Sequence, residues 1–250
     1  MNKNSNFVIS GSSTRGFSLV ELSIVLVIIG IIVGVVTAGV TIQKTSELRS
    51  IITQVEQFKV GIEAFDDKFE DLPGDMADAF DYWGADCDAT NTNCNGDGNG
   101  IVAIGSGSDS ESFRAWQHLS LAGMIDGEYT GTGTGTAHIP FENVPGTSRT
   151  GGAYHIRTHT NDTQTVAGTN VSVGGFLASN WPAEKFLTPS EAFYIDNKMD
   201  DGDPDSGKSQ SRNYFSGGSW QTGCISGTDP NRTYLKTGDD KFCIMFFDIR

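Results

Sequence analysis

The hydrophobic pattern is dominated by one unbroken apolar run near the N-terminus. Residues 17–40 read FSLVELSIVLVIIGIIVGVVTAGV, and Glu21 is the only charged residue among them. A helix needs about 20 apolar residues to cross a bilayer, so this run predicts a membrane-spanning helix. The polar segment before it contains two basic residues and no acid, which favours a cytoplasmic N-terminus. Lys44 and Arg49 on the far side weaken that bias.

A second pattern follows the apolar run without a break. Beyond Lys44, apolar residues recur at steps of 4, 3, 3, 4, 3 and 4, which is the spacing of one helix face. They are Leu48, Ile52, Val55, Phe58, Ile62, Phe65 and Phe69. Leu72-Pro73-Gly74 then predicts a helix stop and a turn. We therefore expect one helix of about 55 residues, roughly 80 Å long, that is apolar all round at first and amphipathic afterwards.

The rest of the chain is polar and rich in Gly, Ser, Thr, Asn and Asp, which predicts short strands and many turns around a modest core. Residues 71–107 are loop-like, residues 112–125 predict a helix, and residues 153–173 and 241–250 predict strands. Thr188-Pro189-Ser190-Glu191 is a typical helix start, and we expect this helix to run to about Met199. The predicted fold class is α+β.

Charge and cysteine content limit the kinds of partner and the cellular compartment that we expect for this chain. The formal net charge of -14 argues against nucleic acid as the main partner, because phosphate binding needs a basic surface. The four cysteines are Cys87, Cys94, Cys224 and Cys243. An even count in an exported chain predicts two disulfides, against the alternative of four buried thiols. Zinc is the weaker alternative, because no Cys-x-x-Cys spacing is present.

Two hypotheses compete for the processing of the N-terminus. Val36-Thr37-Ala38 offers the small residues of an ordinary signal-peptidase site. However, the apolar run exceeds the usual signal-peptide core of about 7–15 residues, and it contains an acid. A carboxylate in an apolar helix costs about 2.5–3.5 kcal/mol at mid-membrane and less near an interface, where Glu21 is placed. Glu21 either reaches back to the headgroups or pairs with a positive group supplied later.

Residues 16–21, Gly-Phe-Ser-Leu-Val-Glu, resemble the prepilin peptidase site of the type IV pilin and type II secretion pseudopilin superfamily. The resemblance implies cleavage after Gly16 on the cytoplasmic side and N-methylation of the new terminal residue, Phe17. It implies that Glu21 meets the N-terminal amine of a neighbouring subunit. It covers about the first third of the chain, and it rests on the basic leader, Gly-Phe, the placed Glu and the apolar run together.

The resemblance also implies an organisation. We expect a leader peptide at 1–16, a transmembrane and assembly helix at 17–41, an amphipathic helix at 42–72 and a globular head at 73–250. The head is expected to be a small antiparallel β-sheet on which the long helix packs. We expect disulfides Cys87–Cys94 and Cys224–Cys243, the second as in the C-terminal disulfides of many pilins. The implied location is the inner membrane as a single pass, then a periplasmic pseudopilus or an extracellular pilus.

Two loops are candidate calcium sites. Asn95, Asp97 and Asn99 place oxygen atoms at alternate positions before a glycine, as in the first half of a calcium loop, and a plain turn explains them equally well. Asp200, Asp201 and Asp203 belong to a run of carboxylates that repel one another unless they are solvated or bridged by a cation. Some pseudopilins bind calcium in a C-terminal loop, which favours this second loop by analogy. The alternative there is a solvated turn after a helix.

The remaining candidate residues favour structure over chemistry. His155 and His159 alternate around Arg157, which indicates one face of a strand more than a metal site. His118 lies beside Trp116 on a predicted helix, and we expect it to be partly exposed. The tryptophans are more typical of core or interface positions than of sugar platforms. No nucleophile-elbow, zinc-protease, P-loop or dinucleotide motif is present, and we expect no enzyme.

The leading hypothesis is a filament subunit that polymerises through its N-terminal helix. Its implied partners are other pilin or pseudopilin subunits, prepilin peptidase, the inner membrane and the assembly platform. The alternative is a minor, tip-located pilin whose Gly/Thr-rich loops bind a surface, a sugar or a secreted protein. A membrane-anchored hydrolase is a third, weaker hypothesis. Abundance in sheared filaments separates the first two.

Overall fold

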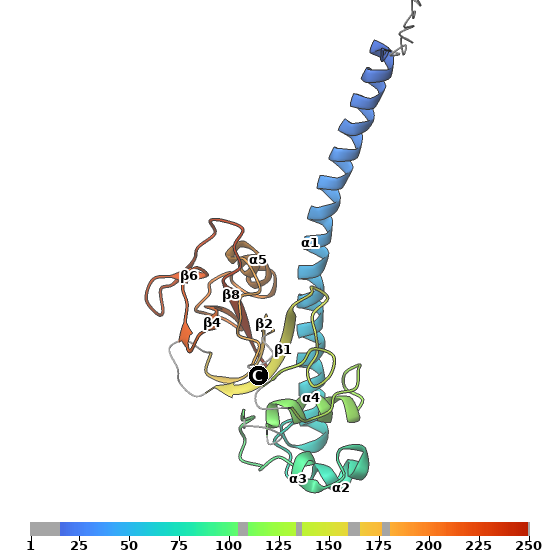
Figure 1. The fold of residues 1–250 in the computed structure, drawn as a ribbon. Helices are drawn as coiled ribbons and strands as arrows, with labels where there is room; N and C mark the ends of the chain where they lie inside the picture. The colour runs from blue at the N-terminus through green and yellow to red at the C-terminus, as the bar shows by residue number, and fades with distance from the viewer. Residues whose placement is uncertain (1–15, 105–109, 134–136, 160–165, 177–180, 250) are drawn as a thin grey trace, which may run out of the picture. The chain divides into compact units, whose positions relative to one another are not determined.

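The computed structural model describes residues 16–104, 110–133, 137–159, 166–176 and 181–249. The chain forms two compact units, Met1–Thr45 and Ser46–Arg250. One helix, α1 (Leu19–Phe69), contributes to both, and its 51 residues match the predicted long helix closely. The α+β class is confirmed, with α1 followed by a small antiparallel sheet (Figure 1).

In the first unit, α1 shows its apolar side chains on every side. From Leu19 to Val36 all the side chains are exposed, including Val27 at 62% and Ile28 at 49%. This part of α1 is long and apolar enough to cross a membrane, judged by length and composition. A helix that is apolar all round requires a nonpolar environment.

In the second unit, the remaining part of α1 buries one stripe. The buried side chains are Leu48, Ile51, Val55, Phe58, Ile62 and Phe65. The ring of Phe58 packs edge-on against the rings of Trp116 and Tyr154, each at a centroid distance of 4.9 Å. The predicted stripe is therefore the core stripe, except that Ile51 is more deeply buried than Ile52.

The main sheet has four antiparallel strands in the order β1-β2-β8-β3. They are β1 (Gly152–His159), β2 (Gly168–Gly175), β8 (Cys243–Asp248) and β3 (Ser209–Asn213). Tyr154 on β1 lies opposite Val173 on β2, which in turn lies opposite Met245 on β8. The Tyr154 hydroxyl donates to Gln54 Oε1 of α1 at 2.9 Å, so this face of the sheet packs on α1.

Both faces of this sheet are covered. Val171, Val173, Met245 and Phe247 belong to the main core that includes the α1 stripe. Ile244 and Phe246, which alternate with them along β8, form a second small core packed by Trp181, Tyr214 and Trp220. Alternation along the strands explains the two cores, because successive side chains point to opposite faces.

Shorter elements complete the second unit. Two of the shorter helices were predicted. They are α4 (Glu111–Leu121), which ends earlier than expected, and α5 (Pro189–Met199), which has the predicted capping box at Thr188 and Glu191. The short strands are β4 (Phe215–Ser216), β5 (Ser219–Trp220), β6 (Ile225–Ser226) and β7 (Thr233–Tyr234).

The loop-like prediction for residues 71–107 was too coarse. This segment contains α2 (Ala79–Trp83), the 3-10 turn η1 (Gly84–Asp86) and α3 (Asn91–Cys94). The buried Arg114 of α4 holds α3 in place, donating to the carbonyls of Thr92, Asn93 and Asn95 at 2.7–3.0 Å. Helices this short have no periodic signal, and long-range contacts of this kind are invisible in a local pattern.

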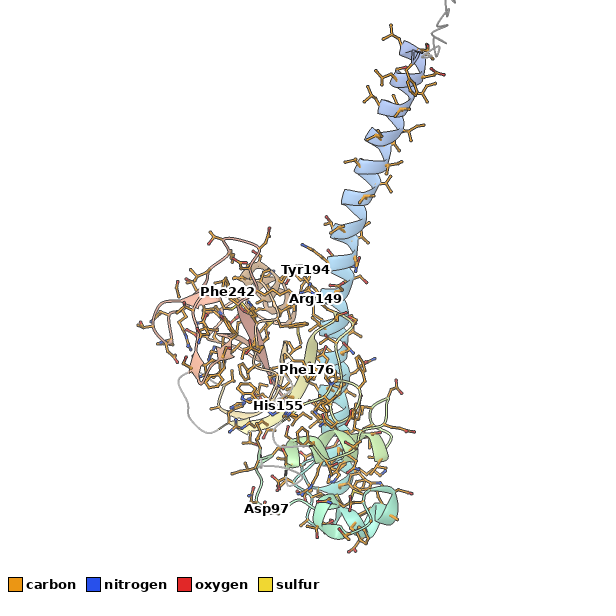
Figure 2. The ribbon with its side chains drawn as sticks, viewed as in Figure 1. Asp97, Arg149, His155, Phe176, Tyr194 and Phe242 are labelled. Carbon is orange, nitrogen blue, oxygen red and sulfur yellow. A yellow bond between two sulfur atoms is a disulfide. The ribbon has the colours of Figure 1, made fainter. Side chains whose placement is uncertain are left out.

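A partly buried ion triad centred on Arg149, which Figure 2 labels, joins α1 and α5. Arg149 Nε lies 2.8 Å from Glu47 of α1, and its other nitrogens bind both oxygens of Glu191 on α5. Bidentate pairing of this kind gives both energy and geometric specificity. The Arg149 side chain is only 10% exposed, so the triad fixes the start of α5 to the second part of α1.

Candidate functional site

The bond that prepilin peptidase is expected to cut lies in exposed, non-helical chain. Gly16, Phe17 and Ser18 precede the first residue of α1, and all three are exposed. The Phe17 side chain is 87% exposed, and nothing lies within 4 Å of a Cβ built at Gly16. A protease needs an accessible backbone outside regular structure, and the bond between Gly16 and Phe17 meets this requirement. Lys3 and Arg15 lie outside the described residues.

Glu21 lies in the first turn of α1 and caps it. Its Oε2 accepts a hydrogen bond from the Ser18 N–H at 2.9 Å, and the Ser18 hydroxyl accepts one from the Val20 N–H at 3.3 Å. The two bonds resemble a capping box, which satisfies N–H groups that have no partner within the helix. The carboxylate also lies at the positive end of the helix dipole. This capping role was not predicted, although Ser-x-x-Glu before an apolar run is its signal.

Residues 11–37 match the family model of the prokaryotic N-terminal methylation motif. This chain carries the prepilin signature of type IV pilins and pseudopilins. The signature implies processing by prepilin peptidase and assembly with other pilin subunits, and it suggests a structural subunit rather than an enzyme. The exposed apolar part of α1 fits membrane anchoring before assembly. No curated protein and no solved structure matches the chain.

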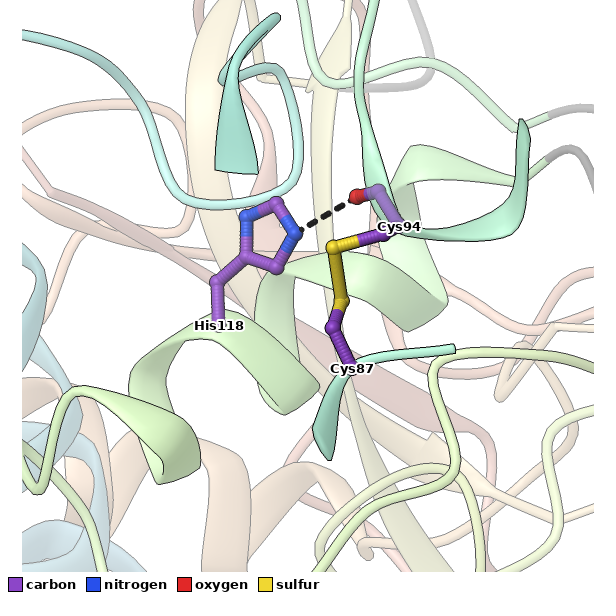
Figure 3. A group of neighbouring side chains, drawn as sticks. All are labelled: Cys87, Cys94 and His118. Atoms are coloured by element: carbon purple, nitrogen blue, oxygen red, sulfur yellow. Dashed lines mark hydrogen bonds between the residues drawn. A yellow bond between two sulfur atoms is a disulfide. The ribbon is translucent and has the colours of Figure 1, made fainter. Parts of the chain in front are cut away.

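The first cysteine pair of the chain forms a disulfide next to a buried histidine (Figure 3). Cys87 is bonded to Cys94. His118 of α4 is fully buried, so the expectation that it is partly exposed was wrong. Its Nδ1 accepts from the Gly74 N–H at 3.0 Å, which leaves Nε2 to donate to the Cys94 carbonyl at 2.8 Å. The ring therefore links the turn after α1 to the disulfide loop.

This histidine is held neutral. Burial lowers the pKa of His118 to about 4, and the hydrogen bond to the Cys94 carbonyl opposes this shift only in part. Protonation would also remove the lone pair that accepts from Gly74. Cys87, Cys94 and His118 lie close enough together to resemble a metal site, but both sulfurs are used in the disulfide. The group is therefore a structural clamp.

The second disulfide joins Cys224 to Cys243. Cys243 is the first residue of β8, the strand that lies between β2 and β3. The Cys224 N–H donates to Asn213 Oδ1 at 2.8 Å, at the end of β3. The bond therefore attaches the loop after β5 to the middle of the sheet.

The first candidate calcium loop, residues 95–99, contributes one residue to a group of three carboxylates. Asp97, which Figure 2 labels, lies with Asp75 and Glu111, and one oxygen of each is within 4.8 Å of the others. Asp75 and Glu111 are buried, and burial raises the pKa of both carboxyls. They accept backbone N–H groups of residues 97–103, for example Gly100 on Asp75 at 2.7 Å. The Asn95 oxygen instead accepts from Phe80 at 2.7 Å, and the Asn99 oxygen from Ile101 at 2.8 Å.

In the second candidate calcium loop, Asp200, Asp201 and Asp203 accept hydrogen bonds from nearby groups of the same chain. Asp201 accepts from the Asp203 N–H at 2.8 Å and from the Ser206 hydroxyl at 2.6 Å. Asp203 accepts from the Asp205 N–H at 3.0 Å, and Asp200 accepts from the Lys208 N–H. Within the described part of the chain, none of the three belongs to a group of three or more metal-donor side chains. Calcium binding at either loop stays a prediction.

Near that loop, Asp196 of α5 is a buried acid that the sequence did not single out. The Tyr234 hydroxyl donates to its Oδ2 at 2.7 Å. Burial raises the pKa of Asp196 to about 7, Asp200 and Asp201 add to the rise, and the Tyr234 hydrogen bond opposes it. Such a carboxyl is partly protonated at neutral pH.

The histidines of β1 lie on one face of a strand, as expected. His155, which Figure 2 labels, and His159 are both buried, and their rings pack against Trp181 at centroid distances of 5.6 and 6.3 Å. His138 packs on His155 at 4.7 Å. Among the described residues, no metal-donor group includes any of these histidines. They form an aromatic layer beneath the second small core.

Proposed function

We propose that this chain is a structural subunit of a type IV pilus or a type II secretion pseudopilus. In this proposal it is inserted in the inner membrane, cleaved after Gly16, methylated at Phe17 and polymerised through α1. The observation that carries the proposal is the methylation motif at residues 11–37, continued by an apolar helix with exposed side chains on all sides.

The physical argument concerns where the exposed apolar surface goes. Side chains from Leu19 to Val36 need a nonpolar environment both before and after assembly. Lipid supplies it first, and a bundle of the same helices from other subunits supplies it afterwards. The exchange conserves apolar burial, so extraction from lipid does not have to expose these side chains to water.

Glu21 favours the helix bundle over the separate subunit, because it can form an ion pair there. In the separate subunit its carboxylate accepts only the Ser18 N–H among the hydrogen bonds described. Cleavage after Gly16 creates a positive amine on Phe17. In a helix bundle, pairing of a Glu21 carboxylate with the Phe17 amine of a neighbour compensates two charges that would otherwise be buried alone.

The mature N-terminus tests the proposal. We expect the N-terminal peptide of the protein from cells that contain prepilin peptidase to begin at Phe17 and to carry one added methyl group. Cells that lack the peptidase are the control, and there the bond between Gly16 and Phe17 should be intact. A mature N-terminus at Gly39 would instead indicate ordinary signal-peptidase processing and would overturn the proposal.

A further inference from the structure

Three aromatic rings meet at the C-terminal end of α1, where α2 lies beside it (Figure 1). Phe69 is the last residue of α1, and Tyr82 and Trp83 are the last two residues of α2. The Phe69 ring packs edge-on against the rings of Tyr82 and Trp83 at centroid distances of 5.3 and 5.5 Å. Phe69 and Trp83 are half-buried and pack on Phe65, whereas Tyr82 is 58% exposed. This aromatic trio is therefore attached to the core on one side and open to solvent at Tyr82.

The surroundings of the trio are strongly acidic. Residues 66–88 contain nine acidic residues and a single basic one, Lys68. The exposed acids among them are Asp66, Asp67, Glu70, Asp78, Asp81 and Asp86. Within the described part of the chain, none of these six forms an ion pair. The chain itself therefore leaves their negative charge without a basic partner.

Acids from the two helices lie close together in space. Burial raises the pKa of Asp71, which lies between α1 and α2 in the chain, and the carboxylates of Asp75, Asp78 and Asp66 add to the rise. The hydrogen bond from the Leu72 N–H opposes this shift. Carboxylates from the end of α1 and from the start of α2 therefore act on the same point.

The spacing along each helix places these acids beside the rings. Asp66 comes three residues before Phe69, and Asp78 comes four residues before Tyr82, which puts each pair on one side of its helix. Asp66 does not stabilise α1, because negative charge at a helix C-terminus opposes the dipole. Asp78 precedes α2, and its side chain makes no capping hydrogen bond. Since the fold gains little from these charges, they are available to an external cation.

The trio already holds one cation of the chain itself. Lys68 Nζ lies 4.9 Å from the centroid of the Phe69 ring. A cation within about 6 Å of a ring centroid is attracted to the face of the ring. Among the described residues, no cation lies over the ring of Tyr82 or Trp83. An exposed ring in acidic surroundings is the combination that favours lysine and arginine side chains.

We propose that the aromatic trio and the exposed acids around it form a docking surface for a lysine- or arginine-rich segment of a partner protein. One basic side chain of that segment stacks on Tyr82, and its neighbours pair with carboxylates of α1 and α2. A segment with several basic side chains reaches acids of both helices at once, which a small cation does not. The inference goes beyond the proposed function and does not depend on it, because all of these residues belong to the second unit.

Peptide binding to the full chain in nonionic detergent tests the docking surface. The probe is a short fluorescent peptide of alternating lysine and serine, and its fluorescence anisotropy at physiological ionic strength measures binding. We expect this peptide to bind, and a matched peptide with glutamate in place of lysine not to bind. Absence of binding by the lysine peptide overturns the proposal, as does equal binding of the two peptides.

Asparagine variants test whether the acids beside the trio are responsible. Asp78→Asn/Asp81→Asn should raise the Kd of the lysine peptide about tenfold, because it removes two carboxylates of the docking surface. The matched control, Asp239→Asn/Asp240→Asn, removes the same charge from exposed acids in another loop. It should change the Kd by less than about twofold, because salt screens distant charges. Equal losses in the two double variants would show a general charge effect and would overturn the proposal.

Ring variants test the aromatic part of the surface. Tyr82→Leu should raise the Kd about fivefold, whereas Tyr82→Phe keeps the ring and should stay within about twofold of the parent. Phe141→Asn removes an exposed ring elsewhere in the second unit and should have no effect. All substituted positions are exposed, so the unfolding curves of the variants should match the parent curve.

Two further outcomes contradict the inference. A Tyr82→Leu protein that binds the lysine peptide as tightly as the parent overturns it. Dimers of the parent that form without peptide and are lost in Asp78→Asn/Asp81→Asn would assign the surface to a second copy of the chain, and would also overturn it. None of these measurements depends on cleavage after Gly16, so the proposed function is tested separately.

Discussion

In the first part of α1, Val27 is 62% exposed and Ile28 is 49% exposed, whereas Val55 and Ile51 in the second part are fully buried. The secondary structure is the same in both parts, and the compared side chains are one valine and one isoleucine in each. The first part presents apolar side chains all round, and the second presents them as a stripe that packs on the sheet and on α4. Apolar side chains of one continuous helix therefore form an internal core in the second part and an uncovered apolar surface in the first.

The largest expected effect is on assembly, through Glu21. We expect Glu21→Ala to give normal levels of processed protein in the membrane and few or no filaments. The neighbour's Phe17 amine would then be buried without a partner, which typically costs about 3–5 kcal/mol. The yield of sheared filaments measures the effect. Parental yields in cells with no other copy of the chain would contradict the pairing role of Glu21.

A substitution in the second part of α1 should lower the stability of the head, in contrast to Glu21→Ala, which should act on assembly. Phe65 is fully buried, and Phe65→Ala should lower the free energy of unfolding of the head by about 3–5 kcal/mol. The matched control is Val27→Ala in the first part, which should change it by less than about 0.5 kcal/mol. Denaturation of the full chain in detergent, followed by tryptophan fluorescence, measures both, because all four tryptophans lie in the second unit. Equal effects would remove the distinction between the two parts.

The disulfides sharpen the comparison, because every cysteine lies in the second unit. Replacing Cys224 and Cys243 together by serine should lower the stability of the head by about 2–4 kcal/mol, through a less restricted unfolded chain. Filament yield in cells should fall only as far as the amount of folded head falls. Non-reducing peptide mapping of the parent protein is the necessary control, and free thiols at all four positions would contradict the prediction.

The smallest expected effect is a difference in pH dependence. No residue between Leu22 and Gln43 is ionisable, so acidification should act on the head. The pKa of His118 is about 4 in the folded protein and about 6.5 when unfolded. The unfolded chain therefore binds the proton first. Through His118, the free energy of unfolding should fall by about 2 kcal/mol as the pH is lowered from about 7 to about 5.

Asp196 should act with the opposite sign. Its folded pKa of about 7 lies above its unfolded value of 3.8, so the folded state binds the proton first and gains stability as the pH falls from about 7 to about 4. The stability advantage of the parent over His118→Gln should therefore shrink on acidification, and its advantage over Asp196→Asn should grow. Parallel curves for the two variants would show that neither group is linked to folding in this way.

Much of this molecule was predictable from local sequence. The apolar run, the heptad-like stripe, the start of α5 and the prepilin motif are each properties of consecutive residues, and each is governed by helix periodicity, capping or direct recognition of a short segment. Glu21 was identified for the same reason, because a lone acid in an apolar run is conspicuous in the sequence.

Only the tertiary structure decided which polar groups share a site. His118 was expected to be partly exposed, and its clamp role depends on Gly74 and Cys94, which are 44 and 24 residues away in the chain. Asp97 was visible as part of a loop, but its carboxylate neighbours Asp75 and Glu111 come from two other segments. A groove lined by Phe58, Met124 and Phe141 likewise combines three separated segments. Burial and long-range hydrogen bonds depend on how distant segments pack, and a local pattern of side chains contains no information about that packing.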